Sequence, residues 1–212
     1  MSDSIKTEAQ TVDPTQMIEQ CKSVLKAGGT VYLGENHTEA DARNVCKAVL
    51  ASHCVQYFCI EFNDSGIERK DKRSIIDYVD FQENQTKVKF IDRTYAVPMK
   101  DVVTMAVDDP GCEVVCIDAT HFRAPDRYGR PGRFQLKVNT STNRQESMRV
   151  KVKECRSKIT MIGRGVLVLV GSDHLVTLND RDVWQALHKI VYDGHSFVYG
   201  KYNNCYMVWQ LS

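Results

Sequence analysis

Apolar runs that suit buried strands alternate with stretches of helical periodicity along most of the chain. The strand-like runs cover residues 30–34, 55–62, 87–91, 113–118 and 165–170. Apolar positions at three- and four-residue spacing predict helices over residues 14–26, 38–52, 69–81, 98–107, 142–159 and 181–191. Strands and helices that alternate in this order are typical of a mainly parallel sheet covered by helices.

The C-terminal pattern is different, because two alternating segments follow one another directly. Residues 196–202 and 205–211 alternate apolar and polar side chains, with Asn203-Asn204 between them. Asparagine tolerates the positive φ that a two-residue hairpin turn demands. The predicted fold class is therefore α/β, with a mainly parallel sheet flanked by helices and a C-terminal antiparallel hairpin.

Length and periodicity also predict the domain organisation. Residues 1–13 are polar and without periodicity, so we expect a disordered N-terminus there. Residues 14–212 have a length that suits one α/β domain.

Overall charge and hydropathy exclude some partners. Lysine plus arginine number 28 and aspartate plus glutamate 27, so we expect no nucleic-acid partner. Every apolar run is far shorter than the ~20 residues of a membrane-spanning helix, and we expect no membrane insertion. No apolar leader follows Met1, which predicts a cytoplasmic protein or one delivered into a host cell without a signal peptide. The eight cysteines are then expected to be mostly buried thiols.

Candidate chemistry gathers where the predicted strands end. Gly34-Glu35-Asn36-His37 and Gly171-Ser172-Asp173-His174 each follow an apolar run, Glu61 lies near the end of another, and Asp118 and His121 end a fourth. The carboxyl ends of parallel strands meet at one edge of a sheet, so we expect these side chains to converge. Imidazole with carboxylate serves metal ligation or general acid-base transfer. We expect Asp118 and His121 to be structural and leave the role of Asp173 open.

The two Gly-x-x-His turns, Glu61, and Arg144 opening a late helix with Met148 four residues on resemble a known superfamily. It joins the Tiki proteases, TraB proteins, erythromycin esterases, ChaN-type haem-binding proteins and several bacterial toxin domains. The resemblance covers residues 30–175. It implies an active cleft built from His37, Glu61, Arg144 and His174, with Glu35 as the other functional side chain of the first turn.

The resemblance further implies a hydrolase that cleaves an amide or ester bond in a peptide or small molecule. His37 with Glu35 or Glu61 would activate a water, directly or through a divalent metal such as Mn, Co or Zn. The metal ligands would be His37, His174 and Glu61. Arg144 would stabilise an oxyanion or bind a substrate carboxylate, and His174 would ligate or orient.

Three alternatives stay open. A cysteine, Cys59 or Cys116, beside a strand-end histidine would make a nucleophile. A ChaN-like module would bind haem or another ligand through the histidines. A toxin or effector domain would act on a host protein.

Overall fold

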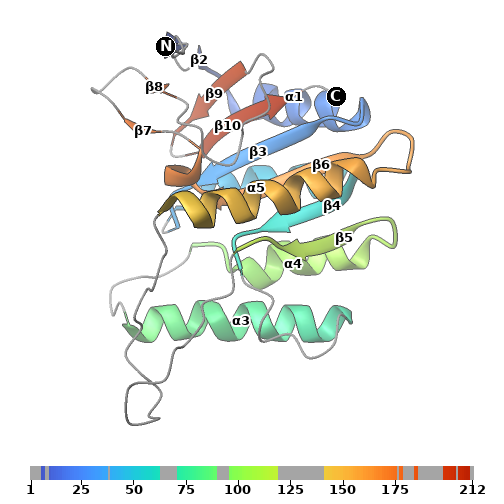
Figure 1. The fold of residues 1–212 in the computed structure, drawn as a ribbon, viewed down its shortest axis with the longest axis vertical. Coiled ribbons are helices and arrows are strands. Elements are labelled where there is room, and N and C mark those ends of the chain that lie inside the picture. The colour runs from blue at the N-terminus through green and yellow to red at the C-terminus, as the bar shows by residue number, and fades with distance from the viewer. Residues whose placement is uncertain are drawn as a thin grey trace.

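The computed structural model confirms the predicted α/β fold class. It describes residues 6–7, 10–37, 39–62, 71–89, 96–118, 141–175, 177–178, 184–185, 198–203 and 205–210. In this part of the chain, a seven-stranded sheet has the order β2-β9-β10-β3-β6-β4-β5 (Figure 1). The neighbours β3-β6, β6-β4 and β4-β5 are parallel, whereas β10 is antiparallel to both β3 and β9.

The elements follow the predicted order. The strands of the main sheet are β2 Gln10–Thr11, β3 Thr30–Glu35, β4 Val55–Ile60, β5 Glu113–Cys116, β6 Gly165–Gly171, β9 Val198–Tyr202 and β10 Cys205–Gln210. The helices are α1 Pro14–Lys26, α2 Asp41–Leu50, α3 Lys72–Lys89, α4 Met99–Asp108 and α5 Ser141–Ser157, and a 3₁₀ turn η1 covers Ser172–His174. Short strands β1 Lys6–Thr7, β8 Trp184–Gln185 and β7 Thr177–Leu178 form a second small sheet.

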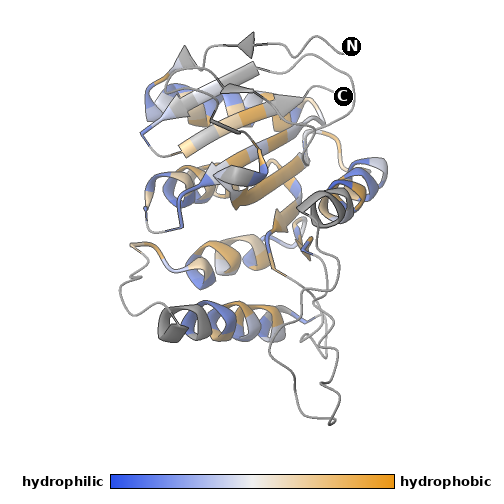
Figure 2. Cartoon of the chain, turned by 60° about the vertical axis from the view of Figure 1, so that its left-hand side comes forward, coloured by the Kyte–Doolittle hydropathy of each residue, from blue (hydrophilic) through white to orange (hydrophobic). Residues whose placement is uncertain are grey.

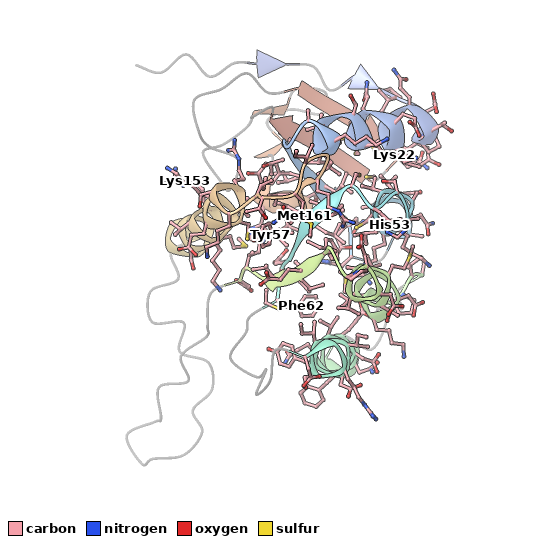
Figure 3. All side chains as sticks on the ribbon, turned by 90° about the vertical axis from the view of Figure 1, so that its right-hand side faces the viewer. Lys22, His53, Tyr57, Phe62, Lys153 and Met161 are labelled. Carbon is pink, nitrogen blue, oxygen red and sulfur yellow. The ribbon has the colours of Figure 1, made fainter. Side chains whose placement is uncertain are left out.

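Helices cover the main sheet on both faces. Figure 3 views the sheet edge-on, with α5 and Lys153 on one side and α1, α2, α4 and His53 on the other. Alternate side chains of each strand enter alternate cores, as a two-residue period requires. Leu167 and Leu169 of β6 pack with the α1, α2 and α4 side, and Val166 and Val168 pack beneath α5.

The central strands are buried on both faces, because one apolar core lies on each side of the sheet. Every residue of β3 and β6 is buried, and Figure 2 shows hydrophobic residues concentrated on the central strands. Such strands read as continuous apolar runs rather than alternating ones, which explains why they were predictable. β6, whose residues are all buried, lies between β3 and β4 and is therefore an interior strand.

The C-terminal hairpin is also as predicted. β9 pairs antiparallel with β10, with Cys205 opposite Tyr202. Asn203 in the connecting turn has φ 47°, in the left-handed region that asparagine tolerates.

Three local predictions were wrong. Residues 87–89 are the last turn of α3 rather than a strand, because the polar stretch before them contains no glycine or proline to end the helix. Trp184–Gln185 is a short strand rather than part of a helix. The second helix begins at Asp41 instead of Thr38, and no side chain caps it.

The disordered N-terminus over residues 1–13 stays a prediction, and the structure places β1 and β2 within that stretch. None of the helices in the described part of the chain combines the length and hydrophobicity that a membrane span requires.

Candidate functional site

Three parallel strands end side by side and carry the candidate residues. β3 ends at Glu35, β4 ends at Ile60 just before Glu61, and β6 ends at Gly171 just before the η1 turn that contains His174. In the β3-β6 ladder Glu35 lies opposite Gly171. The parallel register therefore brings both Gly-x-x-His turns and Glu61 to one edge of the sheet.

Glu35 and His37 form the first histidine–carboxylate pair. Nδ1 of His37 lies 2.7 Å from Oε1 of Glu35. Glu35 is buried, with 3% of its side chain exposed, whereas 41% of the His37 side chain is exposed. An ionised carboxylate only accepts hydrogen bonds, so Nδ1 carries a proton in this contact. Nε2 is then the ring nitrogen that can take up and release a proton.

Arg43 anchors the carboxylate of this pair. Nε of Arg43 donates to Oε2 of Glu35 at 2.7 Å, and Nη2 donates to Oε1 at 3.2 Å. Nη1 donates to Oε1 of Glu83 at 2.6 Å and to the Val97 carbonyl at 2.7 Å. The Arg43 side chain is 2% exposed and lies between two buried carboxylates.

Glu61 and His174 form the second pair. Nε2 of His174 lies 2.9 Å from Oε1 of Glu61, and the Gly171 N–H donates to Oε2 at 2.7 Å. His174 is buried, and its Nδ1 has no hydrogen-bond partner in the described part of the chain. Both oxygens of Glu61 are thus engaged by the turn that follows β6.

The two pairs meet at Gly171. A Cβ built on Gly171 would lie 3.2 Å from Nε2 of His37 and 3.3 Å from Oε2 of Glu61. A Cβ on Gly34, in the other turn, would lie 3.0 Å from a side-chain carbon of Leu175 and 3.1 Å from Cα of Ser172. The glycine of each Gly-x-x-His turn therefore leaves the space that the other turn occupies.

Electrostatics distinguish the members of the first pair. Burial acts to raise the pKa of Glu35, but hydrogen bonds from His37 and Arg43 outweigh it and hold the pKa below its ordinary value. The hydrogen bond to Glu35 raises the pKa of His37, and the charges of Glu35 and Glu61 act in the same direction. Glu35 is therefore held as an anion, and His37 keeps its ring proton to a higher pH than an isolated imidazole does.

The donor set does not fit the predicted metal site. Among the described residues, no three histidine, cysteine, aspartate or glutamate side chains are grouped as they would be around a metal ion. Glu61 instead bonds His174 and the Gly171 amide, and Nδ1 of His37 bonds Glu35. We therefore derive no step through a metal.

The other predicted residues are placed only in part. Arg144 lies in the first turn of α5, and its side chain is outside the described residues, as is that of Asp173. His121 also lies outside them. Asp118 is buried, its N–H donates to the Phe62 carbonyl, and Lys151 donates to its carbonyl, which fits the structural role we expected.

The cysteines are buried as expected, with Cys112 partly exposed. Sγ of Cys59 lies 3.8 Å from Sγ of Cys155, and the pKa of Cys59 is raised by this contact and by burial. Cys59 packs in the core beneath α5, and Cys116 packs in the core on the other face. Neither environment is the electropositive, partly exposed one that activates a thiol, so the structure gives no support to a cysteine nucleophile.

Sequence reasoning missed Arg43 and Glu83. One signal for Arg43 was present: it is the only charged position among the apolar residues of its helix face, which holds Ala42, Val45, Cys46 and Val49. Arginine is seldom buried without a carboxylate partner. Glu83 gave no such signal, because it lies in a polar stretch.

Comparisons with known proteins return only distant likenesses. No protein-family model and no curated protein matches the sequence. The type III effector HopBA1 matches with a TM-score of 0.49 at 12% sequence identity, over 82% of this chain and 79% of that one. RRSP, a MARTX toxin effector domain from Vibrio vulnificus CMCP6, matches with a TM-score of 0.43 at 14% identity, over 84% of this chain and 38% of that one.

Both matched structures are described as effectors. Membership of the Tiki, TraB and erythromycin esterase superfamily stays a prediction.

Proposed function

We propose that this chain is a hydrolase that cleaves an amide or ester bond, with Nε2 of His37 as the atom that takes up and returns the proton. One observation carries the proposal: the buried carboxylate of Glu35, which Arg43 anchors, holds Nδ1 of the partly exposed His37. The other ring nitrogen, Nε2, lies beside Gly171 at the end of β6, where Glu61 also lies. A base oriented by a third group is the arrangement that general acid-base catalysis requires.

The proposed reaction needs only groups of this chain, water and substrate. Nε2 of neutral His37 takes a proton from water as the oxygen attacks the carbonyl carbon. The tetrahedral intermediate then collapses, and the protonated imidazole returns the proton to the leaving amine or alcohol. Glu61, held by His174 and the Gly171 amide, orients the water, and Arg144 stabilises the oxyanion charge.

A metal-assisted version is a separate proposal. It requires Glu61 to release His174 so that His37, His174 and Glu61 face one ion, Mn, Co or Zn. Dialysis against a chelator with elemental analysis tests it. Lost turnover restored by one of these ions supports this version, and unchanged turnover in metal-free protein contradicts it.

Two alternative functions stand beside the hydrolase proposal. A haem-binding module would give a Soret band on haem titration that is lost in His37→Ala. An effector acting on a host protein is the second, and both matched structures are described as effectors. It is compatible with the hydrolase proposal, because a host protein offers amide bonds.

The test compares the His37–Glu35 pair with a second histidine–carboxylate pair of the same chain, His53–Asp109. Turnover is measured on a panel of aryl esters and quenched fluorescent peptides, and new N-termini are mapped by mass spectrometry in cell lysate treated with the protein. We expect His37→Gln to lower turnover by roughly 10²–10⁴-fold, the usual contribution of a general acid-base group.

His53→Gln is the matched control. His53 also bonds a buried carboxylate, with Nδ1 at 3.1 Å from Oδ2 of Asp109, but 68% of its side chain is exposed and it lies before β4 rather than after it. We expect the His53 variant to retain wild-type turnover. A His37 variant as active as the His53 variant contradicts the proposal.

A further inference from the structure

Arg43 makes more contacts than an ion pair needs. Its guanidinium bonds both oxygens of Glu35, one oxygen of Glu83 and the Val97 carbonyl. These groups come from β3, from α3 and from the segment just before α4. This one buried side chain of α2 thus joins the end of β3 to α3 and to the segment before α4. Arg43 lies eight residues after Glu35, the carboxylate that it holds on both oxygens.

Stability alone is a poor reason for such a cluster. Removing charges from water costs about as much as their attraction returns, and apolar residues of similar volume often stabilise a core better than a buried ion pair does. Here one cation also serves two buried carboxylates, Glu35 and Glu83, each about 3% exposed. Glu35 also has a histidine beside it, because Nδ1 of His37 lies 2.7 Å from its Oε1.

We propose that Arg43 is a positioning residue for the site: its fork fixes the Glu35 carboxylate in the orientation that offers Oε1 to Nδ1 of His37. This inference rests on the proposed function of His37. Bidentate contacts fix the plane of a carboxylate, which a single donor does not. With that plane fixed, the proton of neutral His37 stays on Nδ1, and Nε2 keeps its lone pair toward Gly171 and Glu61.

Glu83 sets the position of the fork itself. Oε1 of Glu83 accepts from Nη1 of Arg43, and Oε2 accepts from the N–H of Met99 at the start of α4 at 2.9 Å. Glu83 therefore ties the first turn of α4 to the guanidinium. Glu83 thus acts on the tautomer of His37 indirectly, through Arg43.

The experiment reads the tautomer of His37 directly. Side-chain ¹⁵N chemical shifts distinguish Nδ1–H from Nε2–H at a pH where the imidazole is neutral. We expect wild-type His37 to be the Nδ1–H form. Arg43→Met combined with Glu83→Gln removes one buried positive and one buried negative charge, so the net buried charge is kept and the fold is retained.

In that double variant we expect the Nε2–H form of His37 to become the major neutral form, with kcat lower by about 10- to 100-fold and KM within about twofold, a change typical of lost orientation. Arg43→Lys keeps the charge but not the fork, and we expect an intermediate tautomer ratio. A folded double variant with His37 still in the Nδ1–H form overturns the inference, as does a lysine variant identical to wild type.

The chain offers a matched control for the loss of an arginine. Nη1 of Arg164 donates to Oδ2 of Asp109 at 2.7 Å, and Asp109 bonds His53, so an arginine–carboxylate–histidine chain also lies elsewhere in the molecule. We expect Arg164→Met to leave the His37 tautomer and turnover unchanged. A changed tautomer with full turnover in His37→Gln would remove the proposed function but not the positioning role of Arg43.

Discussion

His37 and His53 make the same kind of contact in different surroundings. Each ring offers Nδ1 to a buried carboxylate that also binds an arginine. Only His37 has a second carboxylate, Glu61, near its other side, at the turn that Gly171 leaves open. At the scale of the residue, the proposed activity therefore depends on Glu61 as well as on the pair of His37 and Glu35.

The pH dependence of turnover follows from the first pair. Glu35 and Glu61 raise the pKa of His37, so the cation persists above the usual value of 6.5 and the neutral base forms only at higher pH. We expect kcat/KM to rise with pH with a midpoint above 6.5. Initial rates between pH 5 and 9 measure it, and a midpoint at or below 6.5 would argue against His37 as the base.

Candidate site residues could be predicted from the sequence where they directly follow an apolar strand. Glu35, His37, Glu61 and His174 were found because strand ends meet at one edge of a parallel sheet. Glu83 was not found, because its contact with Arg43 spans 40 residues and depends on how α3 packs. The metal set of His37, His174 and Glu61 stays a prediction, and the structure pairs Glu35 with His37 and Glu61 with His174.

At the scale of the element, β6 shows how one strand serves both fold and site. Its first residue packs against α1: a Cβ on Gly165 would lie 3.0 Å from Cα of Leu25 in α1 and would also collide with the Gly29 carbonyl oxygen just after that helix. Its last residue, Gly171, leaves room for His37 and Glu61. The two glycines are therefore required for different reasons.

Alanine at each end of β6 separates these reasons. Gly171→Ala places a Cβ 3.2 Å from Nε2 of His37, and we expect turnover to fall about tenfold or more while the unfolding free energy changes by about 1 kcal/mol or less. Gly165→Ala meets backbone, and we expect a loss of about 1–3 kcal/mol or more. Urea unfolding and turnover together check both, and the reverse pattern would refute this division.

Elements were predictable in proportion to how fully they are buried. The bounds of α1 were predicted to the residue from its apolar spacing, Pro14 at its start and the glycines after it. The structure adds that the Asp13 side chain caps its first turn. β3, β4 and β6 were predictable from their apolar runs. Residues 87–89 were not, because a short alternating run reads alike in a strand and in the last turn of a helix.

At the scale of the whole molecule, the sheet separates the candidate site from a polar cluster at its other edge. There Asp109 accepts hydrogen bonds from Arg164, from the Gly111 N–H and from His53. Arg164 also donates to the Val55 carbonyl at the start of β4. This cluster ties the start of β4 to the turn before β5 and contains none of the candidate site residues.

Asp109→Asn tests that structural role. Burial acts to raise the pKa of Asp109, but hydrogen bonds from Arg164, Gly111 and His53 lower it from 3.8 to about 2. A lowered pKa stabilises the fold above about pH 4, and this stabilisation is lost as the pH falls toward 2. We expect the variant to lose about 1–3 kcal/mol at pH 7 and less at pH 3, with turnover unchanged. An equal loss at both pH values in urea unfolding would contradict the role.

The central claim is that the ends of β3, β4 and β6 form one site, and the pKa of His37 tests it without a substrate. The charge of Glu61 raises that pKa. An NMR titration of His37, assigned with His37→Gln, is compared between wild type and Glu61→Gln, with Asp109→Asn as control. The account predicts a lower pKa in Glu61→Gln and an unchanged one in the control, and an unchanged pKa in Glu61→Gln would contradict it.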